Sequence, residues 1–540
     1  MFIFILQVRH LVTGQSEIYL FAVFSALVWA LWLVKVALSR RYRPWTAAHH
    51  ETTTVVVPVV DEPLDLFRDV LRRVVEQHPD EVLVVINGAR NRGLELVCDE
   101  LAPLVQRVHT PVAGKRNAVR IGVEAARHDV VVLLDSDTVW TPGTLTELVK
   151  PFADPRVGGV TTRQRILDPA RSWITRWADW LENTRSLYAM PAQSVLGTVG
   201  CLPGRTIAFR RHVLTRAMPE FLSGRFLGVF LEVSDDRTLT NLTLKQGYRT
   251  AYQHTSLVYT DAPLRVRKLF RQQLRWARGS QYNTLRMLPW MVRHAPVLAL
   301  FFTADILLPF LLVGTIAGWV YRAASGTGVN LYEAMLATYG AQRGWYAVIA
   351  LMIASSALSM AIRQIRHLQE VPGDLLRLPV FIVVSTLFLM PVRLLGFLRM
   401  AHVSGWGTRA GAYAAQPADA APGGGGAGGS AGGGGGAGGG GPDGSAAVLD
   451  RSAAAPPRPA LHLAAGPPGT GDVGAAGVAG ATATAATAVT APPQLVPAPR
   501  RVRDRARTTP PPRRRRVNPL AAVPYLVAAV LLASEALLYV

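Results

Sequence analysis

Five long apolar runs interrupt this chain, and they limit what it can fold into more than any other feature. A helix needs about 20 apolar residues to cross a bilayer. Half of the 540 residues are hydrophobic and the mean hydropathy is positive, which favours membrane helices over a purely soluble protein. The runs cover Ile18–Val34, Pro296–Tyr321, Trp345–Ile362, Leu378–Val392 and Leu520–Val540.

Basic residues near these runs indicate the orientation of the chain. Arg40, Arg41 and Arg43 follow the first run closely, and Lys and Arg concentrate in cytoplasmic loops. We therefore expect a retained N-terminal anchor and a cytoplasmic soluble domain, in a multi-pass protein of the cell membrane. Arginines flank the run Leu378–Val392 on both sides. This run is predicted to lie in the interface or to re-enter, and a plain crossing is the alternative.

The composition changes abruptly after the fourth apolar run. Gly, Ala, Pro and Thr dominate residues 412–499, which predicts a disordered tether. The next residues are rich in arginine and precede the last run, so we expect them to contact anionic lipid and not nucleic acid. The predicted parts are an N-terminal membrane anchor (1–39), a cytoplasmic catalytic domain (40–294), transmembrane and interface helices (295–411), the tether (412–499), a basic juxtamembrane segment (500–518) and a C-terminal transmembrane helix (519–540).

The soluble part alternates between two kinds of pattern. Three continuous apolar, β-branched runs, Thr53–Val60, Val82–Ile86 and Val130–Leu134, are typical of strands buried on both faces. Helical patterns over Leu64–Gln77 and Ala118–Arg127 lie between them. The order strand, helix, strand, helix, strand predicts an α/β fold with a parallel sheet, and ligands at the carboxyl ends of its strands.

Acidic residues follow two of these predicted strands. Asp135-Ser136-Asp137 comes directly after the third strand, and two carboxylates there can hold a divalent cation that neutralises a diphosphate leaving group. The sequence therefore predicts Mg²⁺ or Mn²⁺ as a cofactor. Asp61 and Glu62 follow the first strand. Asp61 can accept a hydrogen bond from a uracil ring, or it can cap the next helix.

Two charged motifs begin helices further along the chain. Lys115 and Arg116 stand where a helix begins, and cations together with free backbone N–H groups suit a phosphate. Asp235 and Asp236 open a later helical stretch. A carboxylate there can take the proton from an attacking sugar hydroxyl, although an N-capping acid with a surface salt bridge gives the same pattern.

A basic helix just before the second apolar run carries the last motif. Gln272, Arg275 and Trp276 form a Q-x-x-R-W arrangement, and residues three or four apart share one helical face. An amide, a guanidinium and an indole can therefore converge on a diphosphate and a sugar ring. The alternative is an Arg-Trp pair that only anchors the helix at the membrane interface.

Taken in order, these motifs resemble the processive family 2 glycosyltransferases, which include hyaluronan, chitin, nodulation chitooligosaccharide and cellulose synthases. The similarity runs from about Thr53 to Arg409. Residues 234–241, reading SDDRTLTN, are similar to the acidic base motif of hyaluronan synthases and their chitin-forming relatives. Residues 406–409 match the W-G-T-R gating segment of that group. The resemblance implies a GT-A glycosyltransferase domain on transmembrane α-helices.

The resemblance also implies a role for each candidate residue. Asp236, beside Asp235, would be the catalytic base, and Asp137 with Asp135 would bind the metal. The acceptor would contact Gln272, Trp276 and Cys201, the last in a segment that loosely resembles the family's S-G-P-L. The nucleotide would be bound by Asp61, Glu62, Lys115, Arg116, Asp135, Arg275 and Arg409.

The expected activity is therefore polymerisation of sugar from a UDP-sugar donor into a growing extracellular polysaccharide, hyaluronan-like or chitin-like, with export across the lipid bilayer. Two alternatives are kept: a non-processive transferase that adds one sugar to a lipid carrier, and a non-catalytic channel subunit. One departure concerns the second strand, which ends in Asn87 where relatives commonly carry an aspartate.

Overall fold

The computed structural model describes residues 18–230, 233–325, 358–402 and 518–536, with a few single residues between 340 and 354. Three predictions lie outside these described residues. They are the tether over 412–499, the arginine-rich part of the basic segment, and the W-G-T-R motif with Arg409. Half of the apolar run Trp345–Ile362 also lies outside them.

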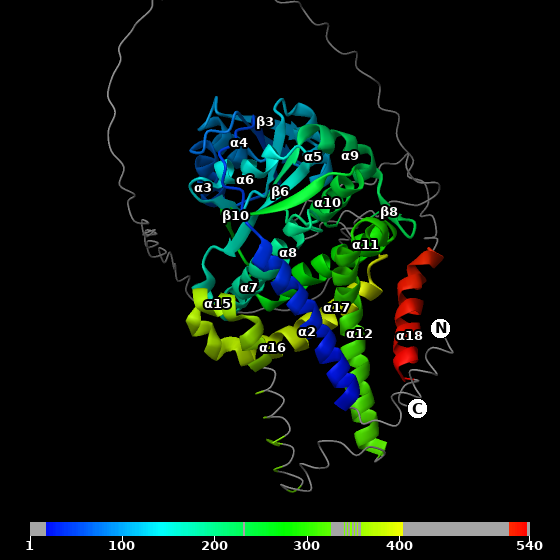
Figure 1. The fold of residues 1–540 in the computed structure, drawn as a ribbon. Helices are drawn as coiled ribbons and strands as arrows, with labels where there is room; N and C mark the ends of the chain where they lie inside the picture. The colour runs from blue at the N-terminus through cyan, green and yellow to red at the C-terminus, as the bar shows by residue number, and fades with distance from the viewer. Residues whose placement is uncertain are drawn as a thin grey trace, which may run out of the picture. The chain divides into compact units, whose positions relative to one another are not determined.

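A mixed eight-stranded sheet forms the centre of the soluble part (Figure 1), in the order β3-β2-β1-β4-β7-β6-β10-β5. The pairs β3-β2, β2-β1, β1-β4 and β6-β10 are parallel, whereas β7 runs antiparallel to both of its neighbours and β5 runs antiparallel to β10. The strands are β1 Thr53–Val59, β2 Glu81–Asn87, β3 Val105–Thr110, β4 Val130–Leu134, β5 Thr138–Trp140, β6 Val157–Ile166, β7 Thr206–Arg210 and β10 Arg249–Thr260.

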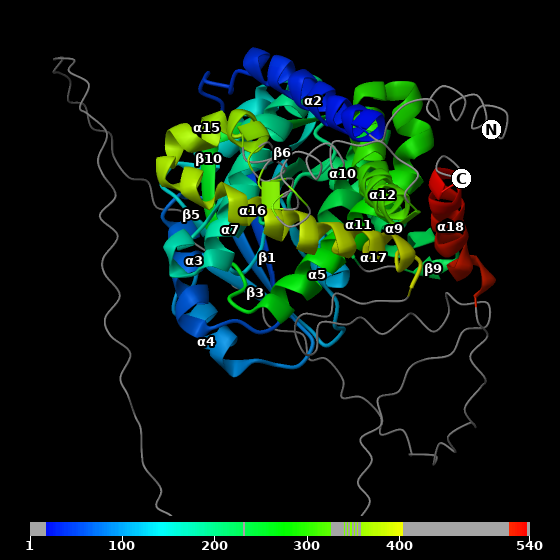
Figure 2. The same cartoon turned by 90° about the horizontal axis from the view of Figure 1, so that it is seen from below.

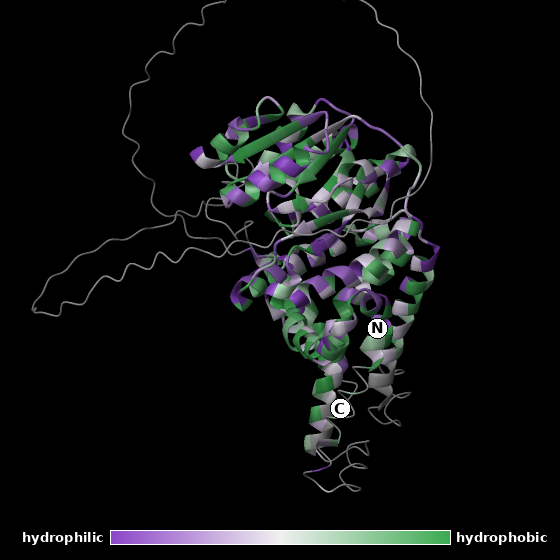
Figure 3. Ribbon diagram, turned by 90° about the vertical axis from the view of Figure 1, so that its left-hand side faces the viewer, coloured by the Kyte–Doolittle hydropathy of each residue, from purple (hydrophilic) through white to green (hydrophobic). Residues whose placement is uncertain are grey.

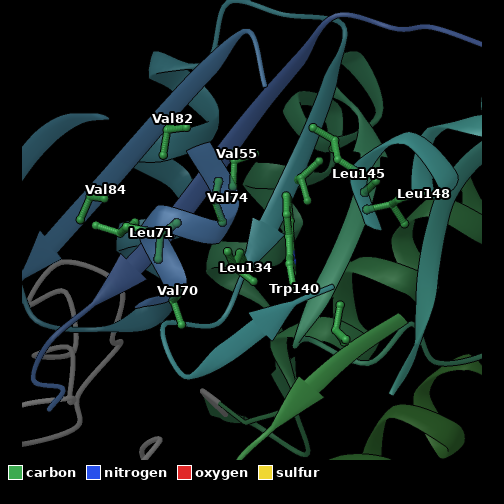
Figure 4. Packing of buried hydrophobic residues seen from close by; sticks show 14 of the residues in the cluster. Val55, Val70, Leu71, Val74, Val82, Val84, Leu134, Trp140, Leu145 and Leu148 are labelled. Atoms are coloured by element: carbon green, nitrogen blue, oxygen red, sulfur yellow. The ribbon is translucent and has the colours of Figure 1, made fainter. Parts of the chain in front are cut away.

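Alternate residues of the central strands pack into two separate hydrophobic clusters, one on each face. In β1, Val55 and Val57 join the first cluster and Val56 joins the second. Figure 4 shows the first cluster, in which Leu71 and Trp140 pack against the strands. The helices of the first face are α3 Leu64–Val75, α4 Arg92–Asp99 and α6 Thr144–Val149, and those of the second are α5 Lys115–Ala125, α9 Arg211–Ser223 and α10 Asp235–Lys245.

This arrangement confirms the predicted α/β class and the three predicted strands. Their β-branched runs are buried on both faces, as the pattern requires, and Figure 3 shows the strands mainly in the hydrophobic colour. The sequence pattern did not reveal β3, β6, β7 and β10. The antiparallel β7, inserted between β4 and β6, makes the sheet mixed where a parallel one was expected.

Apolar runs form long helices outside the sheet. In the chain, α2 comes before the first strand, and α11 and α12 come after the last strand. Within the part of the chain that the structure describes, three segments are long and apolar enough to cross a membrane: Pro296–Gly318, Pro372–Leu398 and Pro519–Ala536. The N-terminal run forms one continuous helix. The helices of this part are α2 Ile18–Arg41, α7 Trp173–Thr184, α8 Met190–Val195, α11 Val266–His294, α12 Pro296–Ser325, α15 Ile365–Glu370, α16 Leu378–Val384, α17 Met390–Leu398 and α18 Val523–Ala536.

The run Leu378–Val392 is divided between α16 and α17, with a π-helical turn at Ser385–Leu389 between them. Its length alone is compatible with a crossing. In Figure 1, however, α16 and α17 run across the direction of α2 and α12 and not along it. This direction favours the predicted interfacial position.

A buried polar network fastens this interfacial segment to the sheet. Arg163 of β6 lies 2.7 Å from the carboxylate of Glu370, which also accepts a hydrogen bond from Asn183 of α7. Asn183 contacts the ring of His367, and the other ring nitrogen of His367 lies 2.9 Å from Asp374. Because buried polar groups are costly to separate from their partners, the network fixes α7 and α15 relative to β6.

Candidate active site

The acidic residues after β1 and β4 meet at one edge of the sheet. The two strands are parallel neighbours, so their carboxyl ends lie side by side. The buried carboxylate of Glu62 accepts a hydrogen bond of 2.8 Å from the Ser136 hydroxyl, in the middle of the Asp135-Ser136-Asp137 motif. Asp61 is exposed beside it. The structure thus brings these two predicted motifs together.

The first residue of α5 joins the same edge. The Lys115 ammonium lies 2.5 Å from a carboxylate oxygen of Asp135. Burial lowers the pKa of Lys115, but the carboxylates of Asp135, Asp235 and Asp236 outweigh it and hold the pKa above its usual value. The Lys115 side chain therefore stays positively charged beside Asp135. A positive charge at this position is suited to a bound diphosphate.

Asn87, at the end of β2, organises this edge although the sequence analysis gave it no role. Its side-chain amide donates to the Val59 carbonyl at 3.0 Å and accepts from the Gly114 N–H at 3.2 Å. Gly114 has a φ of 126°, which only glycine adopts readily. Asn87 therefore ties the end of β1 to the turn that places Lys115. A neutral amide can do both, because it donates and accepts, whereas a carboxylate only accepts.

The donor set at this edge fits a metal ion that arrives with a nucleotide. Among the described residues, no group of three or more His, Cys, Asp or Glu side chains could hold a metal alone. Mg²⁺ commonly binds through one or two carboxylates together with substrate phosphates, and Asp135 with Asp137 supplies that number. Asp135 also pairs with Lys115, and the assignment of Asp137 as a metal ligand stays a prediction from the family resemblance.

Asp236 lies at the start of α10 with both carboxylate oxygens held. One oxygen accepts from the Arg237 N–H at 2.8 Å and the Ser234 hydroxyl at 3.3 Å. The other accepts from the Gly204 N–H at 3.2 Å, and the Cys201 thiol lies 4.0 Å from it. These contacts fix the orientation of a half-buried carboxylate, as a positioned general base requires.

The loop over residues 200–205 connects Asp236 to the acids after β4. Its Arg205 carbonyl accepts from the Asp135 N–H at 3.0 Å, while its Gly204 N–H contacts Asp236. The Arg205 guanidinium lies 2.9 Å from the Glu182 carboxylate and donates to the side-chain Oε1 of Gln164 at 2.6 Å. The loop therefore lies between the predicted base and the predicted metal ligands and contacts both. It also contains Cys201, the predicted acceptor-binding residue.

This loop also touches the first membrane-side helix after the sheet. A Cβ atom added to Gly200 would overlap the ring of Phe302 and lie 2.9 Å from Leu298, both on α12. Gly200 itself is held by Gln193, whose side-chain oxygen accepts from its N–H at 3.0 Å. The loop and α12 are therefore in direct contact, with no space for a side chain between them.

Trp276 of α11 lies at the opposite side of the same loop. The Arg205 guanidinium is 5.8 Å from its ring centre, and 37% of the Trp276 surface remains exposed. An exposed indole face is suited to stacking on a sugar ring. The other two predicted residues of this helix, Gln272 and Arg275, are half-buried on α11.

Two predicted site residues form a buried ion pair. The Arg116 guanidinium lies 2.7 Å from the Asp235 carboxylate, with side-chain exposures of 3% and 8%. Arg116 also donates to the Phe221 carbonyl at 2.8 Å. Buried among the residues of α5, α9 and α10, this ion pair holds the helices together. These contacts favour a structural role, and nucleotide binding by Arg116 and catalysis by Asp235 stay predictions.

Three residues support the site although no sequence motif identified them. Arg205 belongs to the loop beside Asp236, and Glu182 and Gln164 hold its guanidinium. Glu182 is buried, which raises the pKa of its carboxyl, but Arg205 and Arg185 outweigh burial and hold the pKa below its usual value. It therefore stays ionised and fixes Arg205. The three residues come from separate elements, α7, the loop before β7, and β6, and no local pattern relates them.

A substitution at Gly279 tests how tightly the base is positioned. A Cβ atom at this α11 residue would lie 2.5 Å from the Ser234 Cβ, and Ser234 has a φ of 61° two residues before Asp236. We expect Gly279→Ala to lower the transfer rate by up to about a hundredfold, because small displacements of reacting groups are costly. Initial rates of nucleotide release measure it. Gly373→Ala, which meets only an ordinary contact at 3.5 Å, should leave the rate unchanged, and an equally active Gly279→Ala would contradict the assignment.

Comparison with known proteins adds independent information. Residues 50–279 match the family model described as Glycosyltransferase like family 2. A hyaluronan synthase from Streptococcus pyogenes is 24% identical over 388 residues, which cover 70% of this chain and 88% of that protein. An N-acetylglucosaminyltransferase from Azorhizobium caulinodans is 31% identical over 240 residues, which cover 43% of this chain and 60% of that protein.

Among solved structures, a mannosyltransferase from Pyrobaculum calidifontis in complex with GDP-Man and Mn²⁺ aligns with 69% of this chain and 98% of its own. Its sequence identity is 21% and the TM-score is 0.47. The sequence matches, together with the matched domain model, confirm the family resemblance that the motifs indicate.

Proposed function

Since this protein is a glycosyltransferase with a family 2 GT-A domain over residues 50–279, we propose that it polymerises a UDP-sugar into a hyaluronan-like or chitin-like polysaccharide. The enzyme works from the cytoplasmic face of the cell membrane, stays bound to the growing chain and passes it across the bilayer. The names of its relatives, a hyaluronan synthase and an N-acetylglucosaminyltransferase, support this class of product.

The observation that carries the proposal is the loop over residues 200–205. It contacts Asp236 through Gly204, the Asp135 backbone through Arg205, and the Trp276 ring through the same arginine. A base, a metal-binding motif and a sugar-stacking surface are thereby set around one short segment. A non-catalytic channel subunit would not require a base, a metal-binding motif and a sugar-stacking surface around one loop.

In the proposed reaction, Asp236 takes the proton from an acceptor hydroxyl. The hydroxyl oxygen then forms a bond to the anomeric carbon of the donor, and the bond from that carbon to the UDP oxygen breaks, so that the configuration inverts. A divalent cation held by Asp137 would neutralise the charge that develops on the diphosphate. Lys115 stands beside it, while Trp276 holds the acceptor sugar. Asp61 and Glu62 lie at the edge where the nucleotide base is expected.

Transport is proposed from the helices next to this site. Asp305 lies in α12, within the segment Pro296–Gly318 that is long and apolar enough to cross the membrane, and it is exposed on the surface of the described chain. A carboxylate in such a helix is costly in lipid and is expected to face a water-filled path or another helix. We therefore propose that the product passes along the Asp305 side of α12.

Product analysis tests the proposed function. Membranes containing the protein are incubated with labelled UDP-sugars, singly and in pairs, and the products are sized and digested with linkage-specific hydrolases. Long polymer from one donor or one pair is the expected result. A single sugar on a lipid carrier would show a non-processive transferase, and no release of UDP from any donor would show a non-catalytic subunit.

Metal removal gives a second test. We expect EDTA to lower transfer by at least about a hundredfold, because the diphosphate leaving group then departs without a cation, and added Mn²⁺ or Mg²⁺ to restore it. Asp137→Asn should require more metal for half-maximal activity, whereas Asp65→Asn, an exposed acid on α3, should not. Full activity in EDTA would contradict a metal site at Asp137.

A further inference from the structure

The C-terminal helix α18 packs against segments that flank the active site, although residues 403–517 separate it from them in the chain. Asn518 and a 3₁₀ turn, Pro519–Ala522, lead into α18, and this leading segment contacts the β8–β9 hairpin, in which β8 is Arg225–Phe226 and β9 is Val229–Phe230. The Asn518 amide donates to the Leu227 carbonyl at 2.8 Å, while its oxygen accepts from the Leu520 N–H at 3.1 Å. Figures 1 and 2 both show α18 beside this hairpin.

A second contact joins α18 to the end of the interfacial segment. The Tyr525 hydroxyl lies 2.9 Å from the His402 Nε2, and the two rings are 5.8 Å apart. The His402 carbonyl in turn accepts a hydrogen bond from Arg278 of α11. The W-G-T-R motif begins four residues after His402 in the sequence, so Tyr525 contacts a residue shortly before it.

Apolar packing links these two contacts. Ala528 of α18 belongs to a buried cluster with Val229 of β9, Val233, Phe397 of α17 and Tyr282 of α11. The Tyr282 hydroxyl donates to the Val233 carbonyl at 2.5 Å. Val233 precedes Ser234 and the predicted base Asp236 by one and three positions. The side of α18 that carries Ala528 therefore supports the segment leading into the base.

Along its length α18 also lies against α12. Gly314 of α12 has no space for a side chain because Glu535 of α18 lies there. Asn518, just before α18, contacts the hairpin of the catalytic domain, and Glu535 near the end of α18 lies against Gly314, well along α12. Both helices therefore begin beside the catalytic domain and run in the same direction. The helix α18 is thus held near its start by Tyr525 and near its end by Glu535.

We infer that α18 is a docking helix that holds the hairpin before Asp236 and the residues before the W-G-T-R motif in their working positions, and that Asn518 and Tyr525 are its positioning residues. This inference rests on the proposed function, because the positions matter for donor binding and for retention of the growing chain. Asn518 and Tyr525 act through Leu227 and His402 and do not touch the reacting atoms.

A double-mutant cycle in the full-length protein tests the role of Tyr525. Tyr525→Phe removes one hydrogen bond and keeps the ring, so we expect about a fivefold rise in donor KM or an equal fall in mean product length. His402→Ala should give a similar change, and the double variant should add little to it. Leu526→Ala is the control, because Leu526 is 64% exposed on the same helix. Additive effects, or values within twofold of the unchanged protein, would overturn the role of Tyr525.

Asn518→Ala provides a variant that is independent of the aromatic contact. It should shift donor KM or product length in the same direction as Tyr525→Phe, with the thermal unfolding of the whole protein unchanged within about a degree. A change in unfolding temperature alone, with kinetics unaffected, would show a purely structural contact and overturn the positioning role.

Docking is measured separately from activity by a disulfide between α12 and α18. The Glu535 Cβ lies 3.1 Å from the Cβ position at Gly314, near the roughly 3.8 Å of a disulfide. In Gly314→Cys/Glu535→Cys protein with a protease site inserted in residues 423–441, the two fragments should stay linked without reductant and separate with it. Gly314→Cys/Ala533→Cys should not link, because Ala533 is exposed and lies about 200° around the helix from Glu535. No link in the first pair would overturn the docking, whatever polymer the enzyme makes, whereas a linked protein without polymer would contradict only the proposed function.

Discussion

An Asp236→Asn protein is expected to fold normally and to transfer sugar at least about a hundredfold more slowly than the unchanged enzyme. General-base catalysis typically contributes a factor of about 10² to 10⁴, and an amide cannot accept the proton of the acceptor hydroxyl. The amide retains the shape of the carboxylate, but its single oxygen can accept from only one of the N–H groups of Gly204 and Arg237, which reach different carboxylate oxygens. The loss should therefore lie in kcat, with donor KM little changed. Initial rates of UDP release and of polymer formation measure both.

The control for this experiment is a second acid-to-amide change outside the site. Asp65→Asn removes an exposed carboxylate that pairs only with Arg68 in the first turn of α3, and its kinetics should match those of the unchanged enzyme. If Asp236→Asn protein made polymer at a near-normal rate, Asp236 would not be the base. The contact between its carboxylate and Gly204 would then have only a structural purpose.

Arg116→Ala should produce the largest loss of stability of any single change in the catalytic domain that we consider. It leaves the Asp235 carboxylate buried without its 2.7 Å partner, and breaking a buried ion pair in this way typically costs about 3–5 kcal/mol. Denaturant unfolding of the purified protein, followed by tryptophan fluorescence, measures the free energy of unfolding. Asp235→Ala should lower it similarly, because it strands the guanidinium.

A pair on the exposed side of the same helix serves as the reference. Arg120 and Glu124 lie 2.7 Å apart with side-chain exposures of 33% and 57%, and an exposed pair of this spacing contributes about 0.3–0.5 kcal/mol. Arg120→Ala should therefore change stability little. If Arg116→Ala proved as stable as Arg120→Ala but raised the donor KM strongly, Arg116 would belong to the nucleotide-binding set.

The sequence alone could not predict that Lys115 and Arg116, which are adjacent in the chain, have different surroundings. Both are cations at the start of α5, and both suit a phosphate by residue type. Successive residues on a helix point about 100° apart, so one faces Asp135 at the sheet edge and the other enters the core beside Asp235. The same holds for Asp235 and Asp236 on α10. A motif identifies such a pair, but only the packing of the helix decides which member reaches the site.

The central strands were predictable for the opposite reason. Burial on both faces requires a continuous apolar run, and the runs in β1, β2 and β4 have no other simple explanation. β7 and β10 carry polar and charged residues among their apolar ones, so the same pattern did not reveal them. The support of Arg205 by Glu182 and Gln164 depends on β6 and β7 lying near α7. Sequence spacing contains no information on that arrangement.

The contact between Gly200 and the Phe302 ring has a mechanical consequence. Because a side chain cannot fit between them, a movement of the first part of α12 would press on the turn beside Asp236. In the proposed membrane enzyme, a change in the tilt of α12 would therefore alter the position of the predicted base. We expect the rate of sugar transfer to depend on the thickness of the bilayer that surrounds the protein.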